Sequence, residues 1–115
     1  MHEKDLKISI LNDYYGTLLK KNQAEIVDLY YNQDLSLAEI SEELNISRQG
    51  VHDSLKRAEK ILVEYENKLK LCERLNKYNN IAEKIRQYAE NINSENYIDN
   101  ADKIKAEANK ILNEG

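Results

Sequence analysis

The fold is decided by one stretch, Leu37-Ala-Glu-Ile-Ser-Glu-Glu-Leu-Asn-Ile-Ser47-Arg-Gln-Gly-Val-His-Asp-Ser-Leu-Lys-Arg57. It contains two amphipathic segments separated by Asn45 and Ile46, and the second segment opens with Ser47 and ends with basic residues. Two helices joined by a short turn form a helix-turn-helix, a motif that places its second helix in the major groove of DNA. The competing interpretation is two ordinary packed helices joined by a short loop. The pattern favours the helix-turn-helix.

The proposed turn has the residue types that such a turn needs. Ser36 and Glu39 have the spacing of a capping box, which predicts that a helix begins there. Asn tolerates the left-handed backbone that ends helices, so Asn45 is a suitable stop. Ser47 is a suitable cap for the second helix. We expect Ile46, between these two residues, to point into the core.

The composition favours an all-helical protein. The 115 residues include no Pro and only three Gly, and 33% of them are charged. Few helix breakers, together with abundant Leu, Ile, Lys and Glu, are typical of helices. A chain of this length makes one domain, or a small domain with an extension. We therefore expect an all-α fold with a helix-turn-helix domain and a long C-terminal helical extension.

The residues before the turn predict two further helices. The first covers residues 4–19, because apolar side chains recur there at steps of four. Its apolar face is predicted to contain Leu6, Ile10, Tyr14 and Leu18. Asn22 and Glu25 have the spacing of another capping box, so the second helix is predicted to begin at Asn22.

The residues after the turn follow a heptad pattern. Apolar side chains recur at alternating spacings of four and three over Val51, Leu55, Ala58, Leu62, Tyr65, Leu69 and Cys72. Such a seam needs a partner helix, either in a second copy of the chain or among the final helices of the same chain. The pattern slips between Leu75 and Asn80, which predicts a bend there. A second break is predicted at Asn93-Ser94, where Ser94 would cap a last helix.

These patterns divide the chain into two predicted parts. Residues 1–62 form the helix-turn-helix domain, and residues 63–115 form a helical extension that would serve as a dimerisation arm. A homodimer would double the contact area with DNA and match a palindromic site.

Charge changes sign at the proposed turn. The chain as a whole carries a net charge of −4, which argues against indiscriminate nucleic-acid binding. Residues 35–44 contain three Glu and no basic residue, whereas residues 47–60 contain four basic and two acidic residues. The second helix is therefore the part of the motif suited to DNA phosphates.

Helical periodicity separates the two sides of this second helix. Val51 and Leu55 are expected to face the core, which leaves the polar residues on the outward side. The candidate DNA-binding residues are Arg48, Gln49, His52, Lys56, Arg57 and Lys60. The alternative is a solvated charged face.

Each candidate has a chemistry that suits a base or a phosphate. Gln49 can pair with adenine, and Arg48 or Lys56 with guanine or phosphate. Arg57 and Lys60 are better placed for phosphate. Asp53 lies on the same side and would be repelled, unless it accepts a hydrogen bond from cytosine or pairs with Lys56 or Arg57.

The sequence lacks the patterns of several other functions. One cysteine, Cys72, cannot form an internal disulfide, which fits a reducing cytosol. We see no membrane-spanning run and no signal peptide, so we expect a cytoplasmic protein. Neither a metal-ligand spacing nor a catalytic constellation is visible, so we expect no metal, no cofactor and no enzyme activity.

A further set of motifs runs through the first part of the chain. They are Leu6-x-Ile-x-Ile-Leu-x-Asp-Tyr-Tyr-Gly16, Asn22-Gln-Ala-Glu-Ile26, Leu29-Tyr-Tyr-Asn32, Asp34-Leu-Ser-Leu-Ala-Glu-Ile-Ser-Glu-Glu-Leu44 and Ile46-Ser-Arg-Gln-Gly-Val-His-Asp53. Together they resemble the YlxM family of small bacterial proteins, over roughly residues 6–75.

The resemblance implies both a fold and two classes of partner. Members of that family have a helix-turn-helix similar to the fourth region of sigma factors, which reads promoter DNA. The resemblance therefore implies a regulator of transcription that binds double-stranded DNA. Genes of the family lie beside those of the signal recognition particle GTPase and its receptor. It therefore also implies a role in that pathway, alternatively as a non-enzymatic adaptor that docks onto components of the particle.

Overall fold

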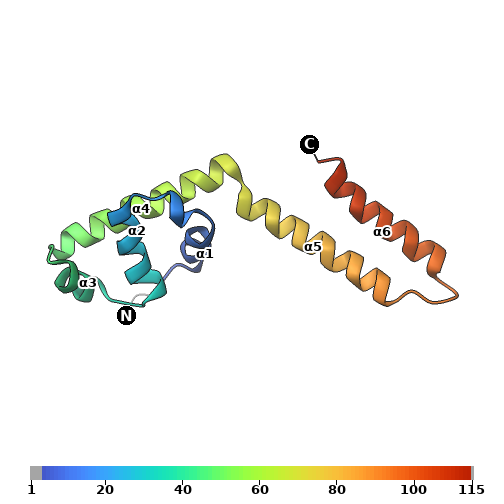
Figure 1. The fold of residues 1–115 in the computed structure, drawn as a ribbon, viewed down its shortest axis with the longest axis horizontal. Coiled ribbons are helices and arrows are strands. Elements are labelled where there is room, and N and C mark those ends of the chain that lie inside the picture. Colours follow the sequence, from blue (N-terminus) through green and yellow to red (C-terminus); the bar gives the residue numbers. More distant parts are fainter. Residues whose placement is uncertain (1–3, 115) are drawn as a thin grey trace. The chain divides into compact units, whose positions relative to one another are not determined.

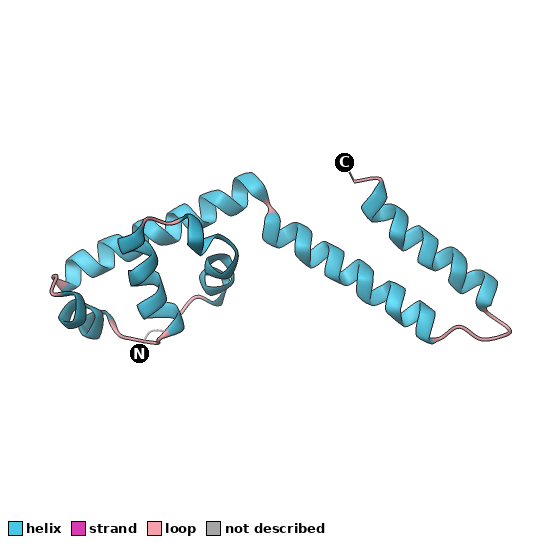
Figure 2. Cartoon of the chain, in the orientation of Figure 1, coloured by secondary structure: helices cyan, strands magenta, loops and turns pink. Residues whose placement is uncertain are grey.

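All regular secondary structure in residues 4–114, the part of the chain that the computed structural model describes, is helical (Figure 2). Residues 1–3 and 115 lie outside this part. The elements are α1 (Leu6–Tyr15), the 3-10 turn η1 (Gly16–Leu18), α2 (Lys21–Val27), the π-helical turn η2 (Asp28–Asn32), α3 (Leu37–Leu44), α4 (Arg48–Leu69), α5 (Leu71–Glu90) and α6 (Tyr97–Leu112). The predicted all-α class is confirmed. Among these helices, none has the combination of length and hydrophobicity that crossing a lipid bilayer demands.

The chain forms two compact units. The first ends at Cys72 and the second begins at Glu73, so the division falls just after the junction of α4 and α5. The sequence placed its boundary after Leu62, but α4 continues through that residue. Leu62 itself is fully buried in the core of the first unit.

The core of the first unit forms where α1, α2 and α3 pack against α4 (Figure 1). Its most deeply buried large side chains are Leu11, Tyr15, Val27, Ile40, Val51 and Leu62. Four consecutive positions of the heptad seam, from Val51 to Leu62, belong to this core. Their partners are therefore the preceding helices of the same chain, as expected for Val51 and Leu55, rather than a second copy or the final helices.

The buried face of α1 differs from the predicted one. Leu6 is 79% exposed, and Ile10 and Leu18 are also exposed, whereas Ile8, Leu11 and Tyr15 are buried. Steps of four drift around a helix of 3.6 residues per turn, while spacings of three and four keep side chains on one face. The predicted apolar face was wrong for this reason. The regular helix also ends earlier than predicted, at Tyr15.

The start of α2 also differs from the prediction. This helix begins at Lys21, and Lys20 precedes it without a side-chain cap. Asn22 therefore lies inside the first turn, where its side chain accepts a hydrogen bond from the Gln23 amide at 3.1 Å. The predicted capping box was wrong, because the N-cap position belongs to Lys20, two residues before Asn22.

The break between α4 and α5 lies at Lys70, which has a left-handed backbone with φ 54° and ψ 30°. The Leu71 amide donates to the Tyr15 hydroxyl oxygen at 3.0 Å, and the Cys72 amide donates to a Glu66 carboxylate oxygen at 3.0 Å. These contacts satisfy the first amides of α5, which have no partner within their own helix. The predicted bend between Leu75 and Asn80 was wrong, since α5 runs through those residues without interruption.

The second unit is a hairpin of α5 and α6. Its turn is held by the Asn93 side chain, which accepts hydrogen bonds from the amides of Glu95 and Asn96. The predicted break at Asn93 is confirmed, but Ser94 does not cap the last helix. In the described part of this unit Ile81 is the only buried hydrophobic residue, and the polar residues Asn100 and Glu107 are buried with it.

Candidate nucleic-acid interface

The turn between α3 and α4 is fixed by side-chain hydrogen bonds at both helix starts. Ser36 accepts from the Glu39 amide at 3.1 Å, and Glu39 accepts from the Ser36 amide at 3.0 Å, so the predicted capping box is confirmed. Asn45 is left-handed with φ 55° and ψ 46°, as predicted. Ser47 caps α4 by accepting from the Gly50 amide at 2.9 Å. These contacts hold the start of α4 at a fixed position relative to α3.

Ile46 does not enter the core as expected. Its side chain is 41% exposed, and its backbone makes the structural contribution instead. The Ile46 amide donates to the Ser41 carbonyl at 3.2 Å, and the Ser41 hydroxyl donates to the Ile46 carbonyl at 2.6 Å. Ser41 therefore fixes the turn by hydrogen bonding, and the exposed side chain of Ile46 is tolerated.

The outward side of α4 carries all six candidate residues. Val51 and Leu55 are buried against the other helices, as predicted. Exposed side chains on the opposite side belong to Arg48, Gln49, His52, Lys56, Arg57 and Lys60. The structure thus brings the predicted residues together on the first four turns of one helix.

Asp53 interacts with two of these candidates. The Gln49 side-chain amide donates to Asp53 Oδ1 at 2.9 Å, and His52 Nδ1 lies 3.5 Å from the same oxygen. The hydrogen bond from Gln49, with a smaller contribution from His52, holds the pKa of the Asp53 carboxyl below its usual value. Asp53 is therefore ionised at neutral pH. The partners expected for its carboxylate were Lys56 or Arg57, but its hydrogen bonds involve Gln49 and His52.

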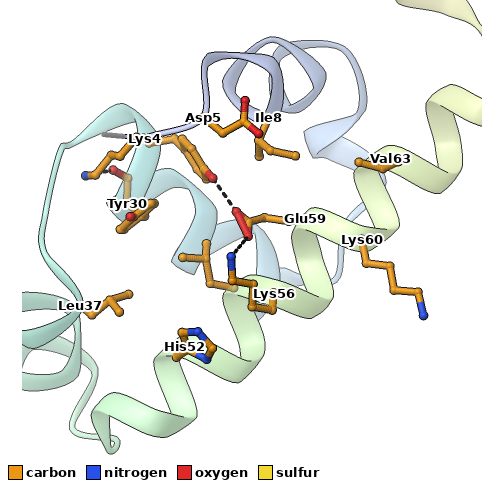
Figure 3. Close-up of a pocket in the computed structure, with 12 residues that line it drawn as sticks. Lys4, Asp5, Ile8, Tyr30, Leu37, His52, Lys56, Glu59, Lys60 and Val63 are labelled. Atoms are coloured by element: carbon orange, nitrogen blue, oxygen red, sulfur yellow. Dashed lines mark hydrogen bonds and ion pairs between the residues drawn. The ribbon is translucent and has the colours of Figure 1, made fainter. Parts of the chain in front are cut away.

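A second carboxylate holds Lys56. Lys56 Nζ lies 3.4 Å from Glu59 Oε1 (Figure 3). The Tyr31 hydroxyl donates to Glu59 Oε2 at 2.5 Å. Burial and the adjacent Glu59 raise the pKa of Tyr31 far above its ordinary value, so this hydroxyl remains protonated. The sequence shows the three-residue spacing of Lys56 and Glu59, but nothing in it indicates that Tyr31 reaches across to α4.

A hollow of about 530 Å³ lies behind this face, between α1, η2, α3 and α4. Its walls include Ile8, Leu37 and Leu55, and its polar lining includes Lys56 and Glu59. The volume is within the range of small-molecule sites.

Lys4 anchors one edge of this hollow. Its ammonium group lies 2.9 Å from Asp34 Oδ1, donates to the carbonyl of Leu35 at 3.0 Å and to that of Tyr30, and sits 4.0 Å from the centre of the Tyr30 ring. These contacts join Lys4, in the segment before α1, to η2 and to the loop before α3. Lys4 thereby helps to fix the position of the helix-turn-helix.

The fold and this exposed face define a helix-turn-helix protein. A family model described as "Putative helix-turn-helix protein, YlxM / p13 like" matches residues 2–104. The chain belongs to this family, UPF0122.

Several curated relatives carry the same family name. A UPF0122 protein of Clostridium novyi is 48% identical over 111 residues, which cover 96% of this chain and 94% of the relative. A UPF0122 protein of Clostridium kluyveri is 43% identical over 111 residues, covering 96% and 97% of the two chains. A third, from Desulforamulus reducens, is 58% identical over 65 residues, which span 56% of each chain. The resemblance drawn from the sequence motifs is confirmed.

Proposed function

We propose that this protein is a non-enzymatic, cytoplasmic regulator of transcription that binds double-stranded DNA through the outward side of α4. The observation that carries the proposal is the gathering of six suitable side chains on one exposed side, while the opposite side of the same helix is buried. A helix held in this way can enter the major groove as a rigid body.

The six side chains divide into two roles. Gln49, His52 and Lys56 would lie nearest the bases, where Gln suits adenine and Lys suits guanine. Arg48, Arg57 and Lys60 would hold phosphates. By analogy between α4 and the recognition helix of the sigma-factor fourth region, the DNA target would be a short sequence within a promoter.

Charge indicates that one chain alone binds DNA weakly. Three basic residues in contact with phosphate would give a slope of about −2.7 in log affinity against log salt, at roughly −0.9 per contact. A homodimer would double this number. The second unit suits an association between copies because a hairpin with so little apolar burial gains stability by packing against another pair of helices.

The test is a titration of the wild-type chain with random-sequence duplex DNA across a salt series, followed by selection of bound sequences. We expect a slope near that value and an enriched motif. Lys56→Glu should weaken binding at least tenfold, because it replaces an attraction with a repulsion at the groove. Lys21→Glu makes the same charge change on an exposed residue at the start of α2, outside both α4 and the second unit, and should leave the affinity nearly unchanged. Equal affinities of the two variants would contradict the proposal.

One observation favours a second candidate function. Asp53 holds an ionised carboxylate in the middle of the face that would enter the groove, and the whole chain has a net charge of −4. These charges suit a protein surface better than a phosphate backbone. In this alternative the chain is an adaptor that docks onto components of the signal recognition particle. A pulldown from nuclease-treated cytosol separates the two, since an adaptor would retain the particle GTPase and a DNA-binding protein would not.

A further inference from the structure

Lys56 differs from the other candidate residues in how its partner is held. Asp53, the partner of Gln49, is half-exposed and hydrogen bonds only within α4. Glu59, the partner of Lys56, has a side chain only 14% exposed, and a residue from another element fixes it. Each of its carboxylate oxygens has a separate partner, Tyr31 on one and Lys56 on the other. The position of this carboxylate is therefore fixed by the hydrogen bond from Tyr31 of η2 as well as by its place on α4.

The Lys56 side chain, by contrast, is 65% exposed and its stem is flexible. Its ammonium group therefore has two available positions. In the structure it lies beside Glu59 at the wall of the hollow (Figure 3). In the other position it would extend from α4 toward a duplex, and it reaches that position only by leaving Glu59.

Building on the proposed function, we propose that Glu59, fixed by the Tyr31 hydroxyl, is a positioning residue that restrains Lys56 and thereby lowers the affinity of α4 for DNA, most of all at selected sites, where the ion pair must be broken. In a non-specific complex with random DNA the contact available to Lys56 is a phosphate, and the gain from one such contact is small. A site with guanine at the matching position offers two acceptor atoms, O6 and N7, on one base. Lys56 then leaves Glu59 on the selected site and stays with it on random DNA.

The test is Glu59→Gln, which keeps the shape of the side chain and an oxygen that can accept from Tyr31. Ion pairs of this exposure change an equilibrium by up to about fivefold. We expect the affinity for the selected sequence to rise about two- to fivefold, because the ion pair no longer has to be broken there. The affinity for random duplex should rise less, while its salt slope steepens by about 0.9, the contribution of one added phosphate contact. The ratio of the selected to the random affinity should therefore rise. Circular dichroism would check that the helical content is unchanged.

Removing any carboxylate near DNA weakens a general repulsion, so the design must separate this effect from the restraint on Lys56. A double-mutant cycle with Lys56→Ala does so, because restraint requires the lysine. Glu59→Gln should have little effect in the Lys56→Ala background, and Glu43→Gln on α3 should give the same small effect with or without Lys56. The restraint on Lys56 is refuted if the gain from Glu59→Gln persists without Lys56. It is also refuted if the wild type binds DNA but Glu59→Gln changes neither the affinity nor the salt slope. In both cases the proposed function stands. If the wild-type chain does not bind duplex DNA, both are refuted.

Discussion

The hydroxyl of Tyr15 makes two hydrogen bonds at the junction of α4 and α5. It donates to Glu66 Oε1 at 2.5 Å and accepts from the Leu71 amide at 3.0 Å, while the ring is 1% exposed and stacks on Tyr65 at 5.9 Å. Tyr15→Phe keeps the ring and its packing and removes only the oxygen. The variant therefore isolates the hydrogen bonding that starts α5.

The expected cost follows from the two hydrogen bonds. A hydrogen bond to a charged group contributes roughly 1.5–3 kcal/mol and one between neutral groups roughly 0.5–1.5 kcal/mol. Leu71 is exposed, so water can replace part of the lost contact with its amide. We expect Tyr15→Phe to lower the free energy of unfolding by about 2–3 kcal/mol.

Urea denaturation followed by circular dichroism measures this loss, and hydrogen exchange locates it. Protection of the Leu71 and Cys72 amides should fall in the variant. Tyr14→Phe is the matched control, because it removes the same atom from the neighbouring residue, whose hydroxyl has no hydrogen bond within residues 4–114. A loss in Tyr15→Phe no larger than that in Tyr14→Phe would refute the assignment of these hydrogen bonds to the stability of the junction.

Two further predictions concern the caps and the buried tyrosines. Ser47→Ala should lower stability by about 1 kcal/mol through loss of the α4 cap, whereas Asn22→Ala should have almost no effect, and urea denaturation would show whether the two differ. Stability should also fall as pH rises above about 10, because the pKa values of Tyr15 and Tyr31 are raised in the folded state and only the unfolded chain ionises there. Tyr31→Phe should reduce this alkaline loss, and an unchanged pH profile would contradict the prediction.

Local chemistry made the turn predictable from the sequence. The caps at Ser36 and Ser47 and the left-handed Asn45 depend on residues within a few positions of each other. Helical periodicity likewise placed Val51 on the buried side of α4 and the candidate DNA-binding residues on the exposed side. These features need no knowledge of distant parts of the chain.

Contacts between distant residues were not predictable in the same way. The start of α5 uses Tyr15, which lies 56 positions before Leu71, whereas the stretch from Leu75 to Asn80, where the pattern predicted a bend, is continuous helix. Tyr31 reaches Glu59 across 28 positions. The spacing of the apolar residues in α1 is compatible with more than one buried face. Packing against α4 buries the face that contains Ile8 and Leu11.

The position of Cys72 gives the molecule a built-in chemical reporter. It is the single cysteine of the chain, its backbone amide takes part in the hydrogen bonding that begins α5, and burial raises the pKa of its thiol. Alkylating reagents attack the thiolate, so they modify this residue slowly at neutral pH and faster whenever the surrounding structure opens. The rate of maleimide labelling in the unaltered protein therefore measures, without any engineered probe, how often the hydrogen-bonded start of α5 around Cys72 opens.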